Sequence, residues 1–200
     1  MAFQNFTFPQ IIRDLGLVLA EGNLFASVAA VAVQPEFVAR IIEGVDLASA
    51  INTEKARSEF AVAPVLFELR RRHVGGLGLF SGIELDADAA RGLNGVCDFI
   101  IAKSPLQHVL STPLITIIEA KNDNLRTGLG QCIAAMVAAY LINQAAATEV
   151  KAIYGAVTTG GSWKFLRLQG DKNVTLDLVE YHVENLGKIL GILGHMVETS

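Results

Sequence analysis

The spacing of apolar and polar residues predicts helices in the first third of the chain. Residues 9–15 and 35–50 carry the patterns of two short helices. Residues 52–73 predict a longer helix, which starts with polar capping residues and stops before a pair of glycines. Pro64 lies in the middle of this segment, and it predicts a kink or a break into two pieces.

Beyond residue 75 the spacing changes to the alternation that is typical of strands. Residues 77–86 and 96–102 predict two strands that are joined by a turn-rich region. Residues 113–120 read PLITIIEA, an almost continuous apolar run that indicates a strand buried on both faces. The later pattern predicts a helix over 128–147, strands over 152–158, 163–168 and 174–179, and a final helix over 183–197.

This order of elements defines the expected fold class. Starting from the helix at residue 52, it is α-β-β-β-α-β, followed by two strands and a helix, which predicts an α/β protein with a mixed sheet. No linker or repeat divides the 200 residues, so we expect a single domain. Within it, residues 1–51 would form a helical extension, 52–158 the core, and 159–200 the C-terminal strands and helix.

Composition supports a folded protein without a membrane span. Hydrophobic residues make up 52% of the chain and the mean hydropathy is +0.42, so disorder is not expected. The most apolar stretch, residues 15–33, is interrupted by Glu21, Gly22 and Asn23, and is too short on either side to cross a bilayer. The first residues lack the basic and apolar regions of a secretion signal. We therefore expect a cytoplasmic protein.

The charge balance does not favour nucleic-acid binding. The net charge is −4 and the pI about 5.6, whereas a basic face is the usual mark of nucleic-acid binding. Bound metal ions or a local basic strip can reverse the sign at a site. The basic run from Arg70 to His73 fits either a solvated helix end or phosphate contacts. Cys97 and Cys132 lie in apolar segments, which indicates buried thiols.

Three charged residues interrupt the predicted strands in a pattern that suits metal-dependent hydrolysis. Asp98 lies inside one apolar run, and Glu119 and Lys121 end another. Glu119 and Lys121 are two residues apart, so their side chains point to the same side of a strand. Two carboxylates on neighbouring strands can bind a hard cation such as Mg²⁺, and a nearby lysine can assist the attacking water. The alternative is a Glu–Lys pair that reaches solvent, with Asp98 at a turn or an edge.

The ordered set resembles the PD-(D/E)XK nuclease superfamily over residues 52–158. The resemblance rests on Asp98, Glu119-Ala120-Lys121 and Gln131, and segments such as LNGVCDFI and IIEAKND resemble small uncharacterised members, many of them cyanobacterial. It implies a restriction endonuclease-like core, a mixed four-stranded sheet flanked by helices. It also implies that Asp98 and Glu119 bind the metal and that Lys121 is catalytic. Cys97 replaces the proline of the superfamily's name, a position where many members diverge.

Many members of this superfamily add a glutamate from the first core helix. Glu59 and Glu68 are nine residues apart, which at 100° per residue puts them on opposite faces of a straight helix. Glu59 has apolar helical neighbours and no obvious partner, whereas Glu68 has Arg72 four residues on, a favourable surface pair. We therefore expect Glu59 to be the third metal ligand and Glu68 to be solvated, an assignment that a kink at Pro64 would reverse.

Gln131 opens the helix after the E-x-K strand, where it either helps to position the site or is an ordinary polar residue. Asn122 and Asp123 either support the site or form a polar turn. The expected function is a Mg²⁺- or Mn²⁺-dependent nuclease acting on nucleic acid, with DNA the favoured substrate, as a homodimer. The alternatives are a catalytically silent nuclease fold that binds nucleic acid or protein, and a structural subunit that packs through helix 183–197.

Overall fold

The computed structural model of the protein describes residues 2–200. Within these residues, seven strands form one mixed sheet in the order β1-β7-β6-β5-β4-β3-β2. The pairs β4–β5 and β1–β7 are parallel, and the other neighbours are antiparallel. The strands are β1 (Val18–Gly22), β2 (Gly78–Asp88), β3 (Leu93–Ala102), β4 (Leu114–Ala120), β5 (Ile153–Thr158), β6 (Ser162–Gln169) and β7 (Asn173–His182).

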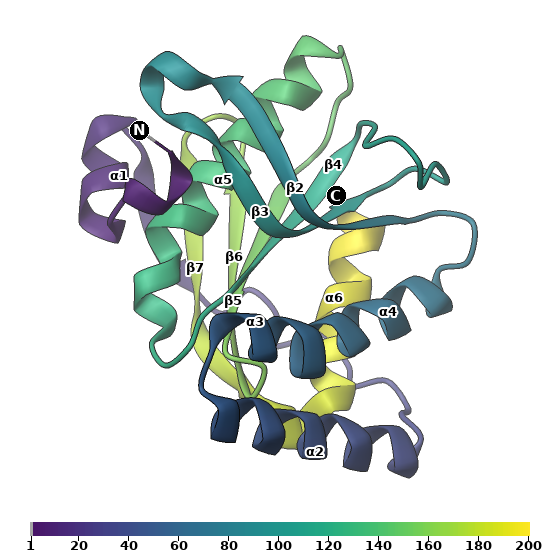
Figure 1. Ribbon diagram of the computed structural model, residues 1–200. Coiled ribbons are helices and arrows are strands. Elements are labelled where there is room, and N and C mark those ends of the chain that lie inside the picture. Colours follow the sequence, from purple (N-terminus) through teal and green to yellow (C-terminus); the bar gives the residue numbers. More distant parts are fainter. Residues whose placement is uncertain (1) are drawn as a thin grey trace.

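Helices cover both faces of this sheet, so the fold has three layers. Figure 1 shows α5 and α1 on one side of the sheet, and α6 and α4 on the other, with α2 below α4. The helices are α1 (Phe8–Asp14), α2 (Pro35–Ile51), α3 (Glu54–Ala56), α4 (Ala63–Arg72), α5 (Leu125–Ala145) and α6 (Leu186–Thr199); the short helical turns are η1 (Phe3–Asn5), η3 (Ala89–Arg91), η4 (Val183–Asn185) and η2, a π-helix (Arg57–Val62).

The strands β4 and β5 lie deep in the sheet because their sequences are apolar on both faces. Every residue of both strands is buried. Their side chains are divided between two apolar clusters: Ile117 joins the cluster under α5, whereas Ile115 and Ile118 join the one under α4 and α6. Burial on both faces is what the run of residues 113–120 predicted.

One buried amide joins the long helix to the start of β4. The side chain of Asn143, in α5, accepts a hydrogen bond from the backbone N–H of Leu114 and donates one to its carbonyl, both at 2.8 Å. Asn143 is 1% exposed, so water cannot replace either hydrogen bond. The amide therefore fixes the far end of α5 to the strand that carries Glu119.

The predicted mixed α/β class is confirmed, and the elements follow the predicted order with ends shifted by a few residues. The description of residues 1–51 as a helical extension is wrong in one respect. Val18–Gly22 form β1, which pairs with β7 and becomes an edge of the sheet. This strand was missed because four of its five residues are exposed and its short sequence shows no clear alternation.

The predicted helix over 52–73 is also interrupted: one division falls directly before Pro64, as the proline predicted, and the earlier ones were not predicted. Asn52 adopts a left-handed conformation (φ 58°) that ends α2, and Thr53 caps α3 by accepting a hydrogen bond from Ala56 N–H. A π-helix follows over Arg57–Val62, and Pro64 falls in the first turn of α4, where its missing N–H costs nothing. The chain is therefore wound more widely than an α-helix just before Pro64.

The helix α5 is long and apolar enough to cross a membrane, judged by length and composition alone. In this fold 67% of its most apolar window is buried against the sheet and α1, as in the core helix of a globular domain. Cys132 lies in this helix and Cys97 in β3, and both thiols are free and buried. This agrees with the interpretation of both cysteines as buried thiols.

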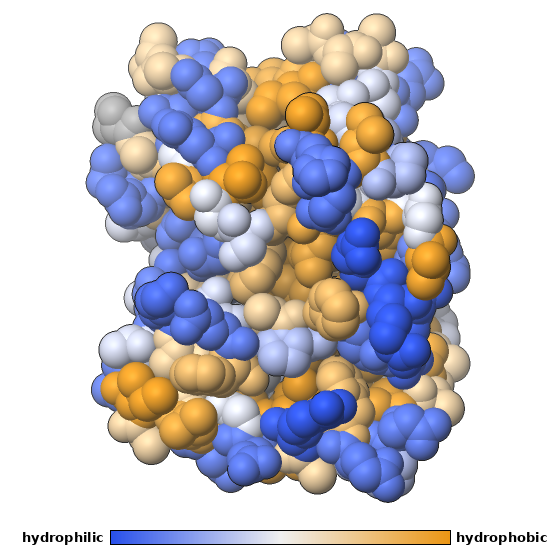
Figure 2. All heavy atoms as spheres, turned by 45° about the vertical axis from the view of Figure 1, so that its right-hand side comes forward, coloured by the Kyte–Doolittle hydropathy of each residue, from blue (hydrophilic) through white to orange (hydrophobic). Residues whose placement is uncertain are grey.

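A hollow of about 370 Å³ lies between α2 and α4, where Phe37, Phe60 and Phe67 meet the side chains of Arg40 and Arg71. Figure 2 shows hydrophobic and hydrophilic side chains side by side on the molecular face that includes these helices. Phe67 is 62% exposed. None of the three predicted core site residues Asp98, Glu119 and Lys121 lines this hollow.

Candidate metal centre

Two carboxylates face each other across neighbouring strands. The β3–β4 register pairs Phe99 with Ile118, so its continuation by one residue puts Asp98 opposite Glu119. Asp98 Oδ2 accepts a hydrogen bond from the backbone N–H of Ala120 at 2.7 Å. This bond keeps the Asp98 side chain directed toward β4, next to Glu119.

Glu119 is completely buried, and only one of its oxygens has a partner. Gln131, in the first part of α5, donates a hydrogen bond to Glu119 Oε2 at 2.7 Å. Glu119 Oε1 has no hydrogen-bond partner among the described residues 2–200. Burial and, next, the charge of Asp98 raise the pKa of Glu119 well above 4.5, while the charge of Lys121 opposes them. A buried carboxylate in this state is costly unless a cation joins it.

Lys121 follows β4 and lies on the same side as Glu119. It is 9% exposed, and its backbone N–H donates to Thr158 O of β5 at 2.8 Å. A close approach by α5 leaves room for its side chain because residue 128 is glycine. A Cβ at Gly128 would lie 2.6 Å from Val157 Cγ1 and 2.9 Å from Lys121 Cγ. Gly128 is therefore needed for the observed path of the lysine.

The acid nearest to Lys121 on the first core helix is Glu54. Its Oε1 lies 3.7 Å from Lys121 Nζ, and its side chain is 56% exposed. The sequence interpretation missed Glu54 because the helix was taken to start at residue 52 and to run straight. The available signal was Thr53, a capping residue whose following glutamate lies in the first turn of a new helix.

The structure contradicts the helical-phase argument for Glu59. Its side chain is 51% exposed and forms an ion pair with Lys55 at 2.7 Å, away from the carboxylates. The 100° spacing does not apply because Glu59 lies in the π-helix, which has more residues per turn. Glu68 does pair with Arg72, as expected, but it is 8% exposed, so the expectation of a solvated side chain is wrong.

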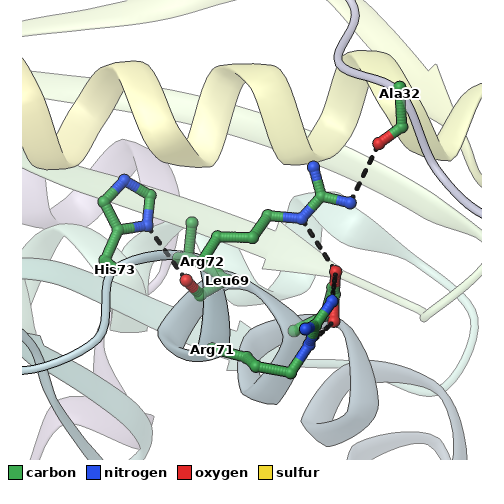
Figure 3. A network of polar contacts seen from close by, with 6 residues as sticks. Ala32, Leu69, Arg71, Arg72 and His73 are labelled. Carbon is green, nitrogen blue, oxygen red and sulfur yellow. Dashed lines mark hydrogen bonds and ion pairs between the residues drawn. The ribbon is translucent and has the colours of Figure 1, made fainter.

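The basic run is partly neutralised by that same glutamate. Figure 3 shows Arg71 and Arg72 turned toward a shared carboxylate, with Arg72 also donating to Ala32 O at 3.0 Å. The carboxylate is Glu68, which accepts from Arg71 Nε at 2.7 Å and from Arg72 Nε at 2.8 Å. The hydrogen bond from Arg71 is the main reason that the pKa of Glu68 lies below its usual value. The arginines thus brace the end of α4.

Arg57 was also missed, because nothing in the sequence marks it as a buried residue. It opens the π-helix, is 8% exposed, and donates to Asn122 Oδ1 at 3.2 Å. Asn122, one of the residues with an open role, follows Lys121 in the chain. Its side chain is held by Arg57 and by the end of α2, because its amide donates to Asn52 O at 3.3 Å.

These residues fit a hard divalent cation in part. Within residues 2–200, no group of three or more His, Cys, Asp or Glu side chains could hold a metal ion. Asp98 and Glu119 nevertheless offer two carboxylates, including a buried oxygen without a partner. Mg²⁺ keeps several waters and is often bound by only one or two carboxylates, so this pair provides enough protein ligands for it.

Gln131 also lines a hollow of about 250 Å³ with Phe3 and Val96.

The chain matches no family model and no curated protein. Its fold is that of a mixed α/β protein with a seven-stranded mixed sheet.

Proposed function

We propose that this protein is a metal-dependent nuclease that hydrolyses phosphodiester bonds. The observation that carries the proposal is the buried Glu119, whose Oε1 has no partner among residues 2–200 although Asp98 lies beside it. Two adjacent carboxylates, one of them without a compensating donor, form an arrangement that a divalent cation stabilises. Lys121, two residues from Glu119, supplies a positive side chain that can assist the attacking water.

The order of elements supports the same proposal. The helical segment 54–72, strands β2 to β4, helix α5 and strand β5 follow the α-β-β-β-α-β order of a restriction endonuclease-like core. Residues 98, 119, 121 and 131, on which the resemblance to the PD-(D/E)XK superfamily rests, come from three consecutive parts of that order. We assign residues 52–158 to this core on these grounds.

In this proposal Asp98 and Glu119 hold Mg²⁺ or Mn²⁺, which supplies an activated water and offsets charge on the phosphate. Gln131 orients Glu119 through its hydrogen bond to Oε2. Lys121 directs its amine to the attacking water and the developing charge. Glu54 lies 3.7 Å from that amine, so it restrains the lysine.

DNA is the proposed substrate and a homodimer the proposed assembly, since a nuclease of this size often needs two copies to cut both strands. A second candidate is a catalytically silent binding module. The net charge of −4 and the pairing of Arg71 and Arg72 with Glu68 favour it, because they leave little basic surface for nucleic acid.

The test is cleavage of single-stranded and plasmid DNA in Mg²⁺ or Mn²⁺ by the wild type, Asp98→Asn and Lys121→Met. We expect cleavage by the wild type only, and Mn²⁺ binding by calorimetry in the wild type and Lys121→Met but not in Asp98→Asn. Equal cleavage by all three proteins would assign the activity to a contaminant. Metal binding without any cleavage would favour the binding module.

A further inference from the structure

A buried arginine joins the three segments that surround Lys121. Arg57 Nη1 donates to Thr159 O at 3.1 Å and to Ser49 Oγ at 3.2 Å, and its Nε donates to Asn122 Oδ1 at 3.2 Å. These acceptors belong to the loop after β5, to α2 and to the loop after β4. One guanidinium therefore connects segments that are far apart in the sequence.

Two of these three acceptors lie next to Lys121 or to the residue that its backbone contacts. Asn122 follows Lys121 in the chain, and Thr159 follows Thr158, whose carbonyl accepts from the Lys121 N–H. Arg57 itself is three residues from Glu54, the ion-pair partner of Lys121, so both lie within about one helical turn. The arginine therefore fixes the backbone on either side of the lysine and the helix that carries its partner.

The charge of Arg57 is not used in an ion pair. Among residues 2–200, its recorded partners are an amide oxygen, a hydroxyl and a carbonyl, and no carboxylate pairs with it. Burying a cation against neutral acceptors is costly. An apolar residue would serve stability alone at lower cost. The arginine therefore indicates that this position requires the fixed, planar set of N–H donors of a guanidinium.

The loop after β5 is shaped to receive this arginine. Gly160 has a φ of +85°, and a Cβ there would lie 2.4 Å from Ala61 Cβ of the π-helix. Thr158 Oγ1 accepts from Gly160 N–H at 2.8 Å and donates to Ser162 O, which closes the turn. The loop thus packs directly on η2, and the carbonyl of Thr159 is held at the guanidinium.

We propose that Arg57 is a positioning residue: its guanidinium aligns the Lys121–Asn122 segment with α3 and the end of β5. The expected loss of catalysis rests on the proposed nuclease function, whereas the expected loosening of the Lys121–Asn122 backbone does not. Lysine at this position keeps the charge but loses the fork, so Arg57→Lys will not restore what Arg57→Met removes.

The first measurement is amide hydrogen exchange by NMR without metal. In Arg57→Met and Arg57→Lys we expect the Lys121 amide to exchange about tenfold faster or more, while the Ile118 amide, within the preceding strand β4, is unchanged. Arg70→Met is the matched control, because Arg70 bonds the side chain of Gln107 on another part of the surface. Unchanged exchange at Lys121 in both Arg57 variants would overturn the proposal.

The second measurement separates positioning from folding and metal binding. With Mn²⁺ affinity and melting temperature close to wild type in Arg57→Lys, we expect kcat for DNA cleavage to fall about tenfold to a hundredfold and KM to change little. Asn122→Ala should lower kcat in the same direction, and combining it with Arg57→Lys should add little further loss. A wild-type kcat in Arg57→Lys would refute a role for the guanidinium donors of Arg57 in positioning Lys121.

An inactive wild type would refute the nuclease function and not this inference, which the exchange experiment decides by itself. If the Lys121 amide then exchanges faster in the Arg57 variants, the positioning role of Arg57 is supported. If its exchange rate does not change, that role is refuted as well.

Discussion

Replacing Glu119 by glutamine should stabilise the metal-free protein and abolish metal binding. Glu119 is buried, its Oε1 lacks a partner among residues 2–200, and Asp98 adds a like charge. Glutamine keeps the shape and can accept the same hydrogen bond from Gln131 through its oxygen. Its amide nitrogen then takes the place of Oε1 beside the Asp98 carboxylate, where a donor is favourable instead of a second negative charge.

The magnitude follows from the cost of an uncompensated buried polar group, about 1–3 kcal/mol, with more for a charged one. We expect Glu119→Gln to raise the free energy of unfolding by about 1–3 kcal/mol at alkaline pH. For a chain of this length that corresponds to about 2–4 °C in melting temperature for each kcal/mol.

The effect must also depend on pH with a definite sign. The folded protein holds a proton on Glu119 at pH values where the unfolded chain, with a pKa near 4.5, has lost it. Folding therefore binds a proton, and stability falls as the pH rises from about 4.5 to the raised pKa of the folded state. Glutamine does not titrate, so the advantage of the variant should grow over that interval.

The assay is thermal unfolding in a metal chelator at about pH 5 and about pH 9, followed by the same series in Mn²⁺. Added Mn²⁺ should raise the melting temperature of the wild type and leave Glu119→Gln unchanged. Glu43→Gln, at an exposed position of α2, is the control for a general charge effect. A variant less stable than wild type throughout this pH range would refute the account of Glu119.

Three further predictions concern the surroundings of the site. Gly128→Ala should cost about 1–3 kcal/mol of stability by urea denaturation and abolish cleavage, since the new methyl displaces the lysine. Gly194→Ala in α6, whose nearest neighbour would be 3.7 Å away, should leave cleavage unchanged and raise stability by up to about 1 kcal/mol. In cleavage assays, Glu54→Gln should lower kcat about tenfold or more, whereas Glu59→Gln should have little effect because its pair with lysine is exposed. Asn143→Ala leaves two buried backbone groups without partners and should cost about 2–4 kcal/mol by urea denaturation; a loss below about 0.5 kcal/mol would contradict the role of its amide.

The central elements of the fold were predictable because burial on both faces leaves a strong pattern in the sequence. The run of residues 113–120 identified β4, and the charged Glu119 and Lys121 were conspicuous because they end it. The sequence suggested that Asp98 and Glu119 lie on neighbouring strands, and the antiparallel β3–β4 register agrees with this. Gln131 was identified by its place at the start of α5, and its bond to Glu119 agrees with a positioning role.

The glutamate of the first core helix that faces the site could not be predicted by the same reasoning. Its direction depends on the number of residues per helical turn and not on burial. A π-helix changes the direction of every side chain within it, and the sequence of residues 57–62 carries no clear mark of that winding. Glu59 was therefore directed to the wrong face and Arg57 was overlooked. The strand β1 was missed because its partner, β7, lies more than 150 residues away, and pairing at such a separation leaves no local pattern.

The parallel pairing of β1 with β7 also determines when the sheet can be completed during synthesis. Val18 aligns with Asn173, so β1 leaves the ribosome long before its partner exists. The core strands β2 to β5 can pair first, and β1 must wait in an unpaired state until β7 has joined β6. Loop closure over this length is slow compared with hairpin formation. Docking of β1 should therefore be the last step by which the nascent chain closes its sheet.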